Sequence, residues 1–117
     1  MKKKILIIED DPAVTDYLTT LFEDNGYTVC SAMSAQDGFA LAQKERPDLI
    51  TLDLELPDEW GPRFYRKLSS DKEIKNTPVI VVSGLSGNKY AVSKAVASFS
   101  KPFDRDKLIK VVRETLG

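Results

Sequence analysis

Three short apolar runs set the strongest limit on the fold of this chain. They are nearly continuous, rich in β-branched residues, and have the sequences ILII (5–8), LITL (49–52) and VIVV (79–82). A strand that is apolar at every position is covered on both faces, which is typical of a parallel sheet. Two weaker runs, YTVCSA (27–32) and SFS (98–100), predict companion strands. The sequence therefore predicts five strands in a parallel sheet.

Segments with helical spacing of apolar residues alternate with these runs. They extend from Pro12 to the Asn25–Gly26 pair, from Ser34 to Glu45, over about residues 61–70, and from Asp104 to Leu116. Asp11, Ser34 and Asp104 are suited to be N-caps, because a short polar side chain can accept a hydrogen bond from the free amides of a first helical turn. Strands and helices thus alternate along the whole chain, which predicts an α/β fold.

A doubly wound, flavodoxin-like domain over residues 1–117 is the predicted architecture. Right-handed crossovers leave few topologies for five parallel strands, and the strand order 2-1-3-4-5 is common at this size. A chain of 117 residues is long enough for one hydrophobic core and too short for two ordinary domains. The helix expected between the fourth and fifth strands is short or irregular, because only a weak apolar stripe is present there.

Composition excludes several classes of function. The net charge of −1 gives no general attraction to nucleic acid or to an anionic membrane, and no apolar run approaches the length of a membrane span. A single cysteine, Cys30, excludes an internal disulfide and is typical of a reducing compartment. We therefore expect a cytoplasmic protein with no direct nucleic-acid or membrane partner. Because histidine is absent, its chemistry must use carboxylates, hydroxyls and lysines.

Polar residues follow four of the five predicted strands. They are Glu9, Asp10 and Asp11 after the first strand, Asp53 after the third, Ser83 after the fourth and Lys101 after the fifth. Open α/β sheets bind ligands beyond the carboxyl ends of their strands, and in the order 2-1-3-4-5 these four strands are neighbours. The sequence therefore predicts one crevice that holds several carboxylates, a hydroxyl and an ammonium.

Carboxylates that face one another repel, so such a cluster either raises its pKa values or binds a cation. Mg²⁺ suits an open site of this kind, because it takes a few oxygen ligands and keeps waters that a phosphate can displace. Asp53 is the candidate nucleophile toward a phosphoryl group, while Glu9 and Asp10 are candidate metal ligands. Lys101 and Ser83 would offer a positive charge and a hydrogen bond to the phosphate. Each of these residues taken alone also fits an ordinary cap or turn.

The sequence resembles the receiver domains of bacterial two-component response regulators. The resemblance rests on ILIIEDDP (5–12), LITLDLELP (49–57) followed by Gly61, VIVVSG (79–84) and SKPFD (100–104), and it covers essentially the whole chain. It implies that Asp53 accepts a phosphoryl group from a histidine kinase or a phosphotransfer protein. Glu9, Asp10, Asp53 and the backbone carbonyl of Glu55 would bind Mg²⁺, and Ser83 and Lys101 would sense the phosphate. Asp11 would then be only a helix cap.

Further expectations follow from the same resemblance. Phosphorylation would switch the binding of a downstream protein, in a chain that is a monomer or a weak homodimer. Such a domain is a signalling phosphoacceptor rather than an enzyme in the usual sense, although it catalyses its own phosphorylation and dephosphorylation. Glu55, two residues past the acceptor, is expected to influence the lifetime of the aspartyl phosphate.

Two features depart from the family pattern. Only 18 positions separate Ser83 from Lys101, so the fourth crossover is compressed. Ser98 stands three residues before the lysine, where the family commonly has an aromatic residue that moves with the switch hydroxyl; either this relay is missing or Phe99 has a different role. We expect the phosphorylation chemistry to persist while its readout is altered.

Two other functions compete with this interpretation. A phosphate-independent interaction module, or pseudo-receiver, could use the same fold, and the unusual fourth crossover favours it. A haloacid-dehalogenase-like phosphohydrolase also uses an aspartate at the end of a strand, and Asp53 and Glu55 loosely imitate its pair of acids. In that family's pattern, however, the supporting acids do not precede the nucleophile, and this chain leaves little room for a substrate cap.

Overall fold

The computed structural model describes residues 2–59, 61–84 and 95–117. Five strands and four helices are found within them. In chain order they are β1 (Lys4–Ile8), α1 (Pro12–Asp24), β2 (Thr28–Ala32), α2 (Ala35–Glu45), β3 (Leu49–Leu52), α3 (Gly61–Ser70), β4 (Val79–Ser83), β5 (Ala97–Ser100) and α4 (Arg105–Leu116). The alternation predicted from the sequence is confirmed. The helix expected between β4 and β5 lies outside the described residues.

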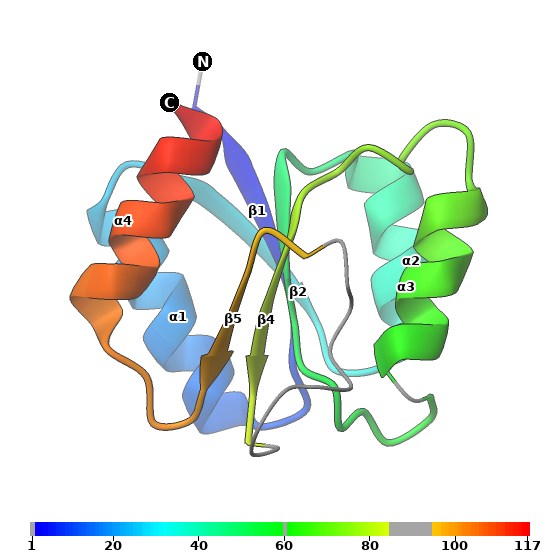
Figure 1. Cartoon of the computed structure of the whole chain (residues 1–117), viewed down its shortest axis with the longest axis horizontal. Coiled ribbons are helices and arrows are strands. Elements are labelled where there is room, and N and C mark those ends of the chain that lie inside the picture. The colour runs from blue at the N-terminus through cyan, green and yellow to red at the C-terminus, as the bar shows by residue number, and fades with distance from the viewer. Residues whose placement is uncertain (1, 60, 85–94) are drawn as a thin grey trace.

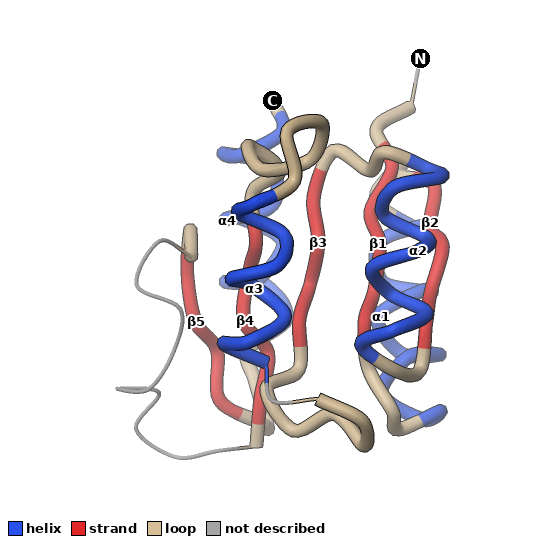
Figure 2. Tube along the Cα trace, turned by 90° about the vertical axis from the view of Figure 1, so that its right-hand side faces the viewer, coloured by secondary structure: helices blue, strands red, loops and turns tan. Residues whose placement is uncertain are grey.

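The five strands form one parallel sheet in the order β2-β1-β3-β4-β5, as predicted. β3 and β4 are buried at every position, as is β1 except at Lys4. The two edge strands are only partly buried, which explains why their sequences are less apolar. Figure 2 shows the strands side by side, with β5 at one edge and β2 at the other.

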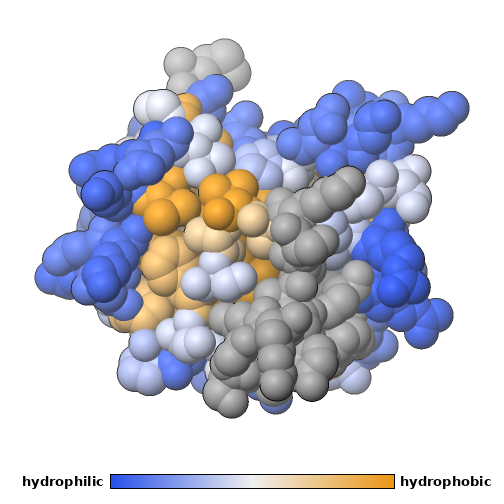
Figure 3. Space-filling model, viewed as in Figure 1, coloured by the Kyte–Doolittle hydropathy of each residue, from blue (hydrophilic) through white to orange (hydrophobic). Residues whose placement is uncertain are grey.

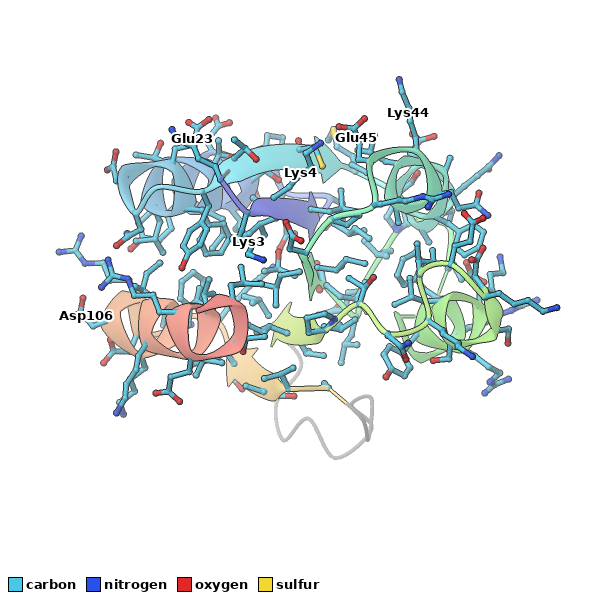
Figure 4. All side chains as sticks on the ribbon, turned by 90° about the horizontal axis from the view of Figure 1, so that it is seen from above. Lys3, Lys4, Glu23, Lys44, Glu45 and Asp106 are labelled. Carbon is cyan, nitrogen blue, oxygen red and sulfur yellow. The ribbon has the colours of Figure 1, made fainter. Side chains whose placement is uncertain are left out.

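Helices cover both faces of the sheet. α1 and α4 lie on one face, and α2 and α3 lie on the other (Figure 1). Neighbouring side chains of β1 point to opposite faces, so Ile5 and Ile7 belong to the core under α1 and α4, whereas Leu6 and Ile8 belong to the core under α2 and α3. The view from above shows the same arrangement of helix pairs on either side of the strands (Figure 4). The fold is therefore the three-layer sandwich expected of a doubly wound sheet.

The three predicted N-caps are found. Asp11 accepts a hydrogen bond from the amide of Ala13, Ser34 accepts one from Asp37, and Asp104 accepts from two amides at the start of α4. Each cap satisfies amides that the helix itself leaves unpaired. None of the helices in the described ranges is long and apolar enough to span a membrane.

The surface around the edge strand β5 is partly apolar. Figure 3 shows apolar side chains gathered on this face of the molecule beside charged margins. Val96, just before β5, is 47% exposed. Phe99 is half-buried and packs against the core under α1 and α4, while Ser98 is exposed. Neighbouring residues on a strand point to opposite faces of the sheet, so Phe99 faces the core while Ser98 faces outward. Phe99 is therefore a core residue and does not replace the aromatic residue that the family commonly has at the position of Ser98.

Candidate functional site

The sheet brings the predicted site residues to one edge. All strands are parallel, so their carboxyl ends lie together, at the bottom of Figure 1 and opposite the two chain ends. Backbone hydrogen bonds extend the ladder into the site: the amide of Asp53 donates to the Ile8 carbonyl at 3.0 Å, and that of Lys101 donates to the Ser83 carbonyl at 2.9 Å. These residues are therefore positioned by the sheet and not by loose loops.

Three carboxylates meet at this edge. Glu9, Asp10 and Asp53 each place a carboxylate oxygen within 4.8 Å of the other two. Glu9 is 2% exposed and Asp53 is 4% exposed, whereas Asp10 is exposed to solvent. The cluster thus has two buried acids and one solvent-facing acid. Oxygen ligands with one open side suit Mg²⁺, which keeps several waters.

Lys101 reaches across to two of these acids. Its Nζ lies 2.7 Å from Glu9 Oε1 and 3.5 Å from Asp53 Oδ2, with its side chain 24% exposed. One ammonium therefore faces two buried carboxylates, and Asp10 adds a third negative charge nearby. The excess of negative charge in this group of four residues is what a divalent cation would compensate.

Burial raises the pKa of Glu9. Its removal from water raises its pKa from 4.5 to about 7, and the charge of Asp53 adds to the rise, although hydrogen bonds from Lys101 and the Asp11 amide lower it. Burial lowers the pKa of Lys101, but the hydrogen bond to Glu9 and the charge of Asp53 outweigh this, so its pKa is raised. Near neutral pH, Lys101 is therefore an ammonium while Glu9 is poised between its two protonation states.

Ser83 and Glu55 are the other predicted site residues. Ser83 is fully buried at the end of β4, in register with Ser100 of β5, the residue before Lys101. The amide of Glu55 donates to Asp53 Oδ1 at 3.0 Å, while its own side chain is exposed. That side chain turns toward the end of β4, because a Cβ atom added to Gly84 would lie 3.6 Å from Glu55 Oε1. The individual roles of these residues stay predictions.

Two site-proximal residues were missed by sequence reasoning. Asp58 accepts hydrogen bonds from the amides of Ala35 and Gln36, at 2.8 and 2.9 Å, and so joins the loop after Asp53 to the start of α2. The side chain of Glu59 is only 10% exposed and pairs with Lys67 of α3 at 3.1 Å. No local pattern indicates the contacts of Asp58, because its partners are 22 and 23 positions away.

Comparison with known proteins agrees with the geometry. Residues 5–113 match the family described as the response regulator receiver domain. The chain is 37% identical over 117 residues to protein Rrf1 of Nitratidesulfovibrio vulgaris, covering 100% of this chain and 85% of that protein. It is 32% identical over 118 residues to protein PilH of Pseudomonas aeruginosa, covering 97% of this chain and 98% of that protein.

A solved structure shares the fold. The chemotaxis response regulator CheY4 of Vibrio cholerae superimposes with a TM-score of 0.88 at 26% identity, over 99% of this chain and 100% of that one. This chain belongs to the response regulator receiver domain family. Receiver domains are signalling domains of two-component systems; they bind Mg²⁺ at an acidic pocket and interact with histidine kinases and downstream effectors. The family interpretation drawn from the motifs is thus confirmed.

Proposed function

We propose that residues 1–117 act as a phosphoacceptor domain in which Asp53 receives a phosphoryl group in the presence of Mg²⁺. The observation that carries this proposal is the meeting of Glu9, Asp10 and Asp53 within 4.8 Å, with the Lys101 ammonium beside two of them. A histidine kinase or phosphotransfer protein is the proposed donor. The chemistry of this donor set fits Mg²⁺, which would be held by the three carboxylates and the backbone carbonyl of Glu55.

Asp53 is suited to be the acceptor because its carboxylate is already oriented. Oδ1 accepts the Glu55 amide at 3.0 Å, and Oδ2 faces Lys101 at 3.5 Å. The carboxylate attacks phosphorus, the bond from phosphorus to the donor breaks, and its electron pair leaves with the donor, which is the imidazole of a phosphohistidine. When bound, Mg²⁺ would offset charge on the phosphoryl oxygens. Attack of water on phosphorus then releases phosphate and restores the Asp53 carboxylate.

Lys101 and Ser83 are the proposed sensors. A phosphoryl group on Asp53 offers Lys101 an anionic partner in place of the Asp53 carboxylate, and Ser83 at the end of β4 offers a hydroxyl. The change in Lys101's partners would alter the end of β5, which directly precedes Lys101 in the chain. Because Ser98 is exposed and Phe99 is packed in the core, we propose that the switch reaches the downstream partner without the usual aromatic relay.

Incubation with Mg²⁺ and a small acyl-phosphate donor tests the proposal. Intact-mass analysis should show the addition of one phosphoryl group to the wild-type chain and none to Asp53→Asn. Asp48→Asn serves as the control. Asp48 directly precedes β3, at the opposite end of this strand from Asp53, and its side chain accepts a hydrogen bond from the Lys4 amide at 2.7 Å. Absence of labelling in the wild-type chain at saturating donor would favour a phosphate-independent interaction module. Steady turnover of a generic phosphate ester would favour a phosphohydrolase.

A further inference from the structure

Asp58 joins the acceptor loop to another helix. It lies in the segment between Asp53 and α3, yet both of its carboxylate oxygens accept hydrogen bonds from the first amides of α2, Ala35 at 2.8 Å and Gln36 at 2.9 Å. These bonds, led by the one from Gln36, lower the pKa of Asp58, so the side chain is ionised throughout the neutral range. Two charge-assisted bonds in a fixed fork define the loop's position better than one flexible contact.

Asp58 adds to the cap of α2 from outside the helix. Ser34 already caps this helix by accepting from the Asp37 amide at 3.1 Å. Asp58 satisfies the two amides that Ser34 leaves unpaired, and it does so from a segment more than twenty positions away. The two hydrogen bonds of Asp58 therefore both pair free amides of α2 and hold the loop after Asp53 against this helix.

The same loop is also attached to α3 and to Asp53. Glu59 pairs with Lys67 at 3.1 Å, and the Glu55 amide bonds to Asp53 Oδ1 at 3.0 Å. The Glu59 pair involves a half-exposed lysine and contributes little by itself, whereas the fork at Asp58 joins the loop to α2 through two hydrogen bonds. Between the acceptor and this fork lie only four residues, 54–57.

We propose that Asp58 is a positioning residue for the metal site: by holding residues 54–57 against α2, it places the backbone of Glu55 for binding of Mg²⁺. This inference rests on the proposed function, in which the Glu55 carbonyl is a ligand. It assigns to Asp58 an effect on metal affinity that acts through the backbone. Outer-shell partners that orient metal ligands commonly change affinity by about 10- to 100-fold when they are removed.

Asp71 provides a matched control. Its Oδ1 accepts the amides of Glu73 and Ile74, at 2.9 and 3.3 Å, and its Oδ2 accepts the side chain of Gln43 in α2 at 3.0 Å. Like Asp58, it is a carboxylate with a lowered pKa that joins one end of α3 to α2. It lies just past the carboxyl end of α3, away from Asp53. Its loss should therefore destabilise the fold without displacing the backbone of Glu55.

The experiment compares Asp58→Ala, Asp58→Asn and Asp71→Ala by calorimetric titration of the metal-free proteins with Mg²⁺, alongside thermal unfolding. Asp58→Ala should bind Mg²⁺ about tenfold more weakly. Asp58→Asn, which keeps one acceptor oxygen, should fall between it and the wild type and serves if the alanine variant does not fold. Asp71→Ala should unfold at a lower temperature but bind Mg²⁺ as the wild type does.

Phosphorylation rates as a function of Mg²⁺ concentration give a second measurement. For Asp58→Ala, half-saturation should move to higher Mg²⁺ while the rate at saturating Mg²⁺ is restored. Equal Mg²⁺ affinity in Asp58→Ala and Asp71→Ala, with a normal wild type, would overturn this inference and leave the proposed function standing. Failure of the wild-type chain itself to bind Mg²⁺ would overturn both.

Discussion

Lys101 Nζ lies 2.7 Å from Glu9 Oε1, although the two residues are 92 positions apart in the chain. The contact joins the end of the edge strand β5 to the end of the interior strand β1, across β3 and β4. It also places the ammonium 3.5 Å from Asp53 Oδ2. Without a metal ion, Lys101 is thus the cation that partly compensates the buried acids.

Replacement of Lys101 by methionine should have opposite effects on folding and on metal binding. In metal-free buffer at neutral pH, the variant should lose about 1–3 kcal/mol of unfolding free energy, because two buried carboxylates lose their charged partner. The same variant should bind Mg²⁺ more tightly than the wild type, because a competing positive charge has been removed. Chemical denaturation in a chelator and titration with Mg²⁺ measure the two quantities.

Lys4→Met is the control for this prediction. Lys4 also pairs with a glutamate, Glu45, at 2.8 Å (Figure 4). Lys4 is the first residue of β1, at the opposite end of that strand from Glu9. Its replacement should leave Mg²⁺ affinity unchanged. If Lys101→Met bound Mg²⁺ no better than Lys4→Met, the proposed competition between the ammonium and the metal would be wrong.

The raised pKa of Glu9 predicts how pH affects the metal-free protein. Folding raises this pKa from 4.5 to about 7, so the folded state favours the protonated carboxyl. The resulting stabilisation is complete below the unfolded-state value and is lost as pH rises through about 7; its full size is on the order of 3 kcal/mol. Denaturation in a chelator should therefore show stability falling from pH 5.5 to pH 8. In Glu9→Gln, which cannot ionise, this fall should be much smaller.

The affinity for Mg²⁺ should change with pH in the opposite direction from the stability of the metal-free protein. A ligand carboxylate must be ionised, so Mg²⁺ binding displaces the Glu9 proton and grows stronger as pH rises through about 7. Titrations at pH 6, 7 and 8 in two buffers with different ionisation enthalpies measure both the affinity and the released proton. Affinity that does not change over this range would show that Glu9 is not a ligand.

The adjacent acids Asp10 and Asp11 should differ in their effects. Asp10 has an oxygen within 4.8 Å of the other cluster carboxylates, whereas Asp11 accepts the Ala13 amide as the cap of α1. Asp10→Asn should weaken Mg²⁺ binding by more than the roughly tenfold expected for loss of an outer-shell partner. Asp11→Asn should keep both affinity and stability, because asparagine is an equally good cap. Equal effects of the two substitutions on Mg²⁺ affinity would argue against a specific site.

Thr51 offers a test of packing beneath the site. Its side chain is 1% exposed, lies between Ile7 and Ile80 in the sheet, and its hydroxyl has no hydrogen-bond partner in the described part of the chain. An unpaired buried hydroxyl costs about 1–3 kcal/mol, so Thr51→Val should raise the unfolding free energy by about 1 kcal/mol. Thr28→Val, at an exposed hydroxyl that donates to the Lys3 carbonyl, should give no such gain. A less stable Thr51→Val would mean that the hydroxyl has a role in the core.

The fold and the strand-end residues were predictable from sequence for a common reason. A parallel sheet buries its central strands on both faces, so β3 and β4 are visible as apolar runs, and their carboxyl ends must lie together. Asp53 and Ser83 follow such runs directly, and Lys101 follows the weaker run of the edge strand β5, so their convergence needed no knowledge of side-chain packing. The caps at Asp11, Ser34 and Asp104 are equally local.

Other features depend on contacts that local sequence does not encode. The fork from Asp58 to α2 and the pairing of Lys101 with Glu9 join segments that only the finished fold brings together. The Thr51 hydroxyl, which has no partner among the residues that the structure describes, likewise cannot be recognised in a run that is otherwise typical of a buried strand. The sequence alone does not decide which face of the sheet Phe99 is on, because a strand of only four residues can present either face to the core until its neighbours are known.

Location of the phosphoryl group within the chain tests the central claim most directly. After reaction with Mg²⁺ and a small acyl-phosphate donor, borohydride reduces an aspartyl phosphate to homoserine, and peptide mass spectrometry identifies the changed residue. We predict homoserine at position 53 and at no other acid of the cluster. Reduction at Asp10 or elsewhere, or an unchanged Asp53 in a protein that has bound Mg²⁺, would contradict the assignment of Asp53 as the acceptor.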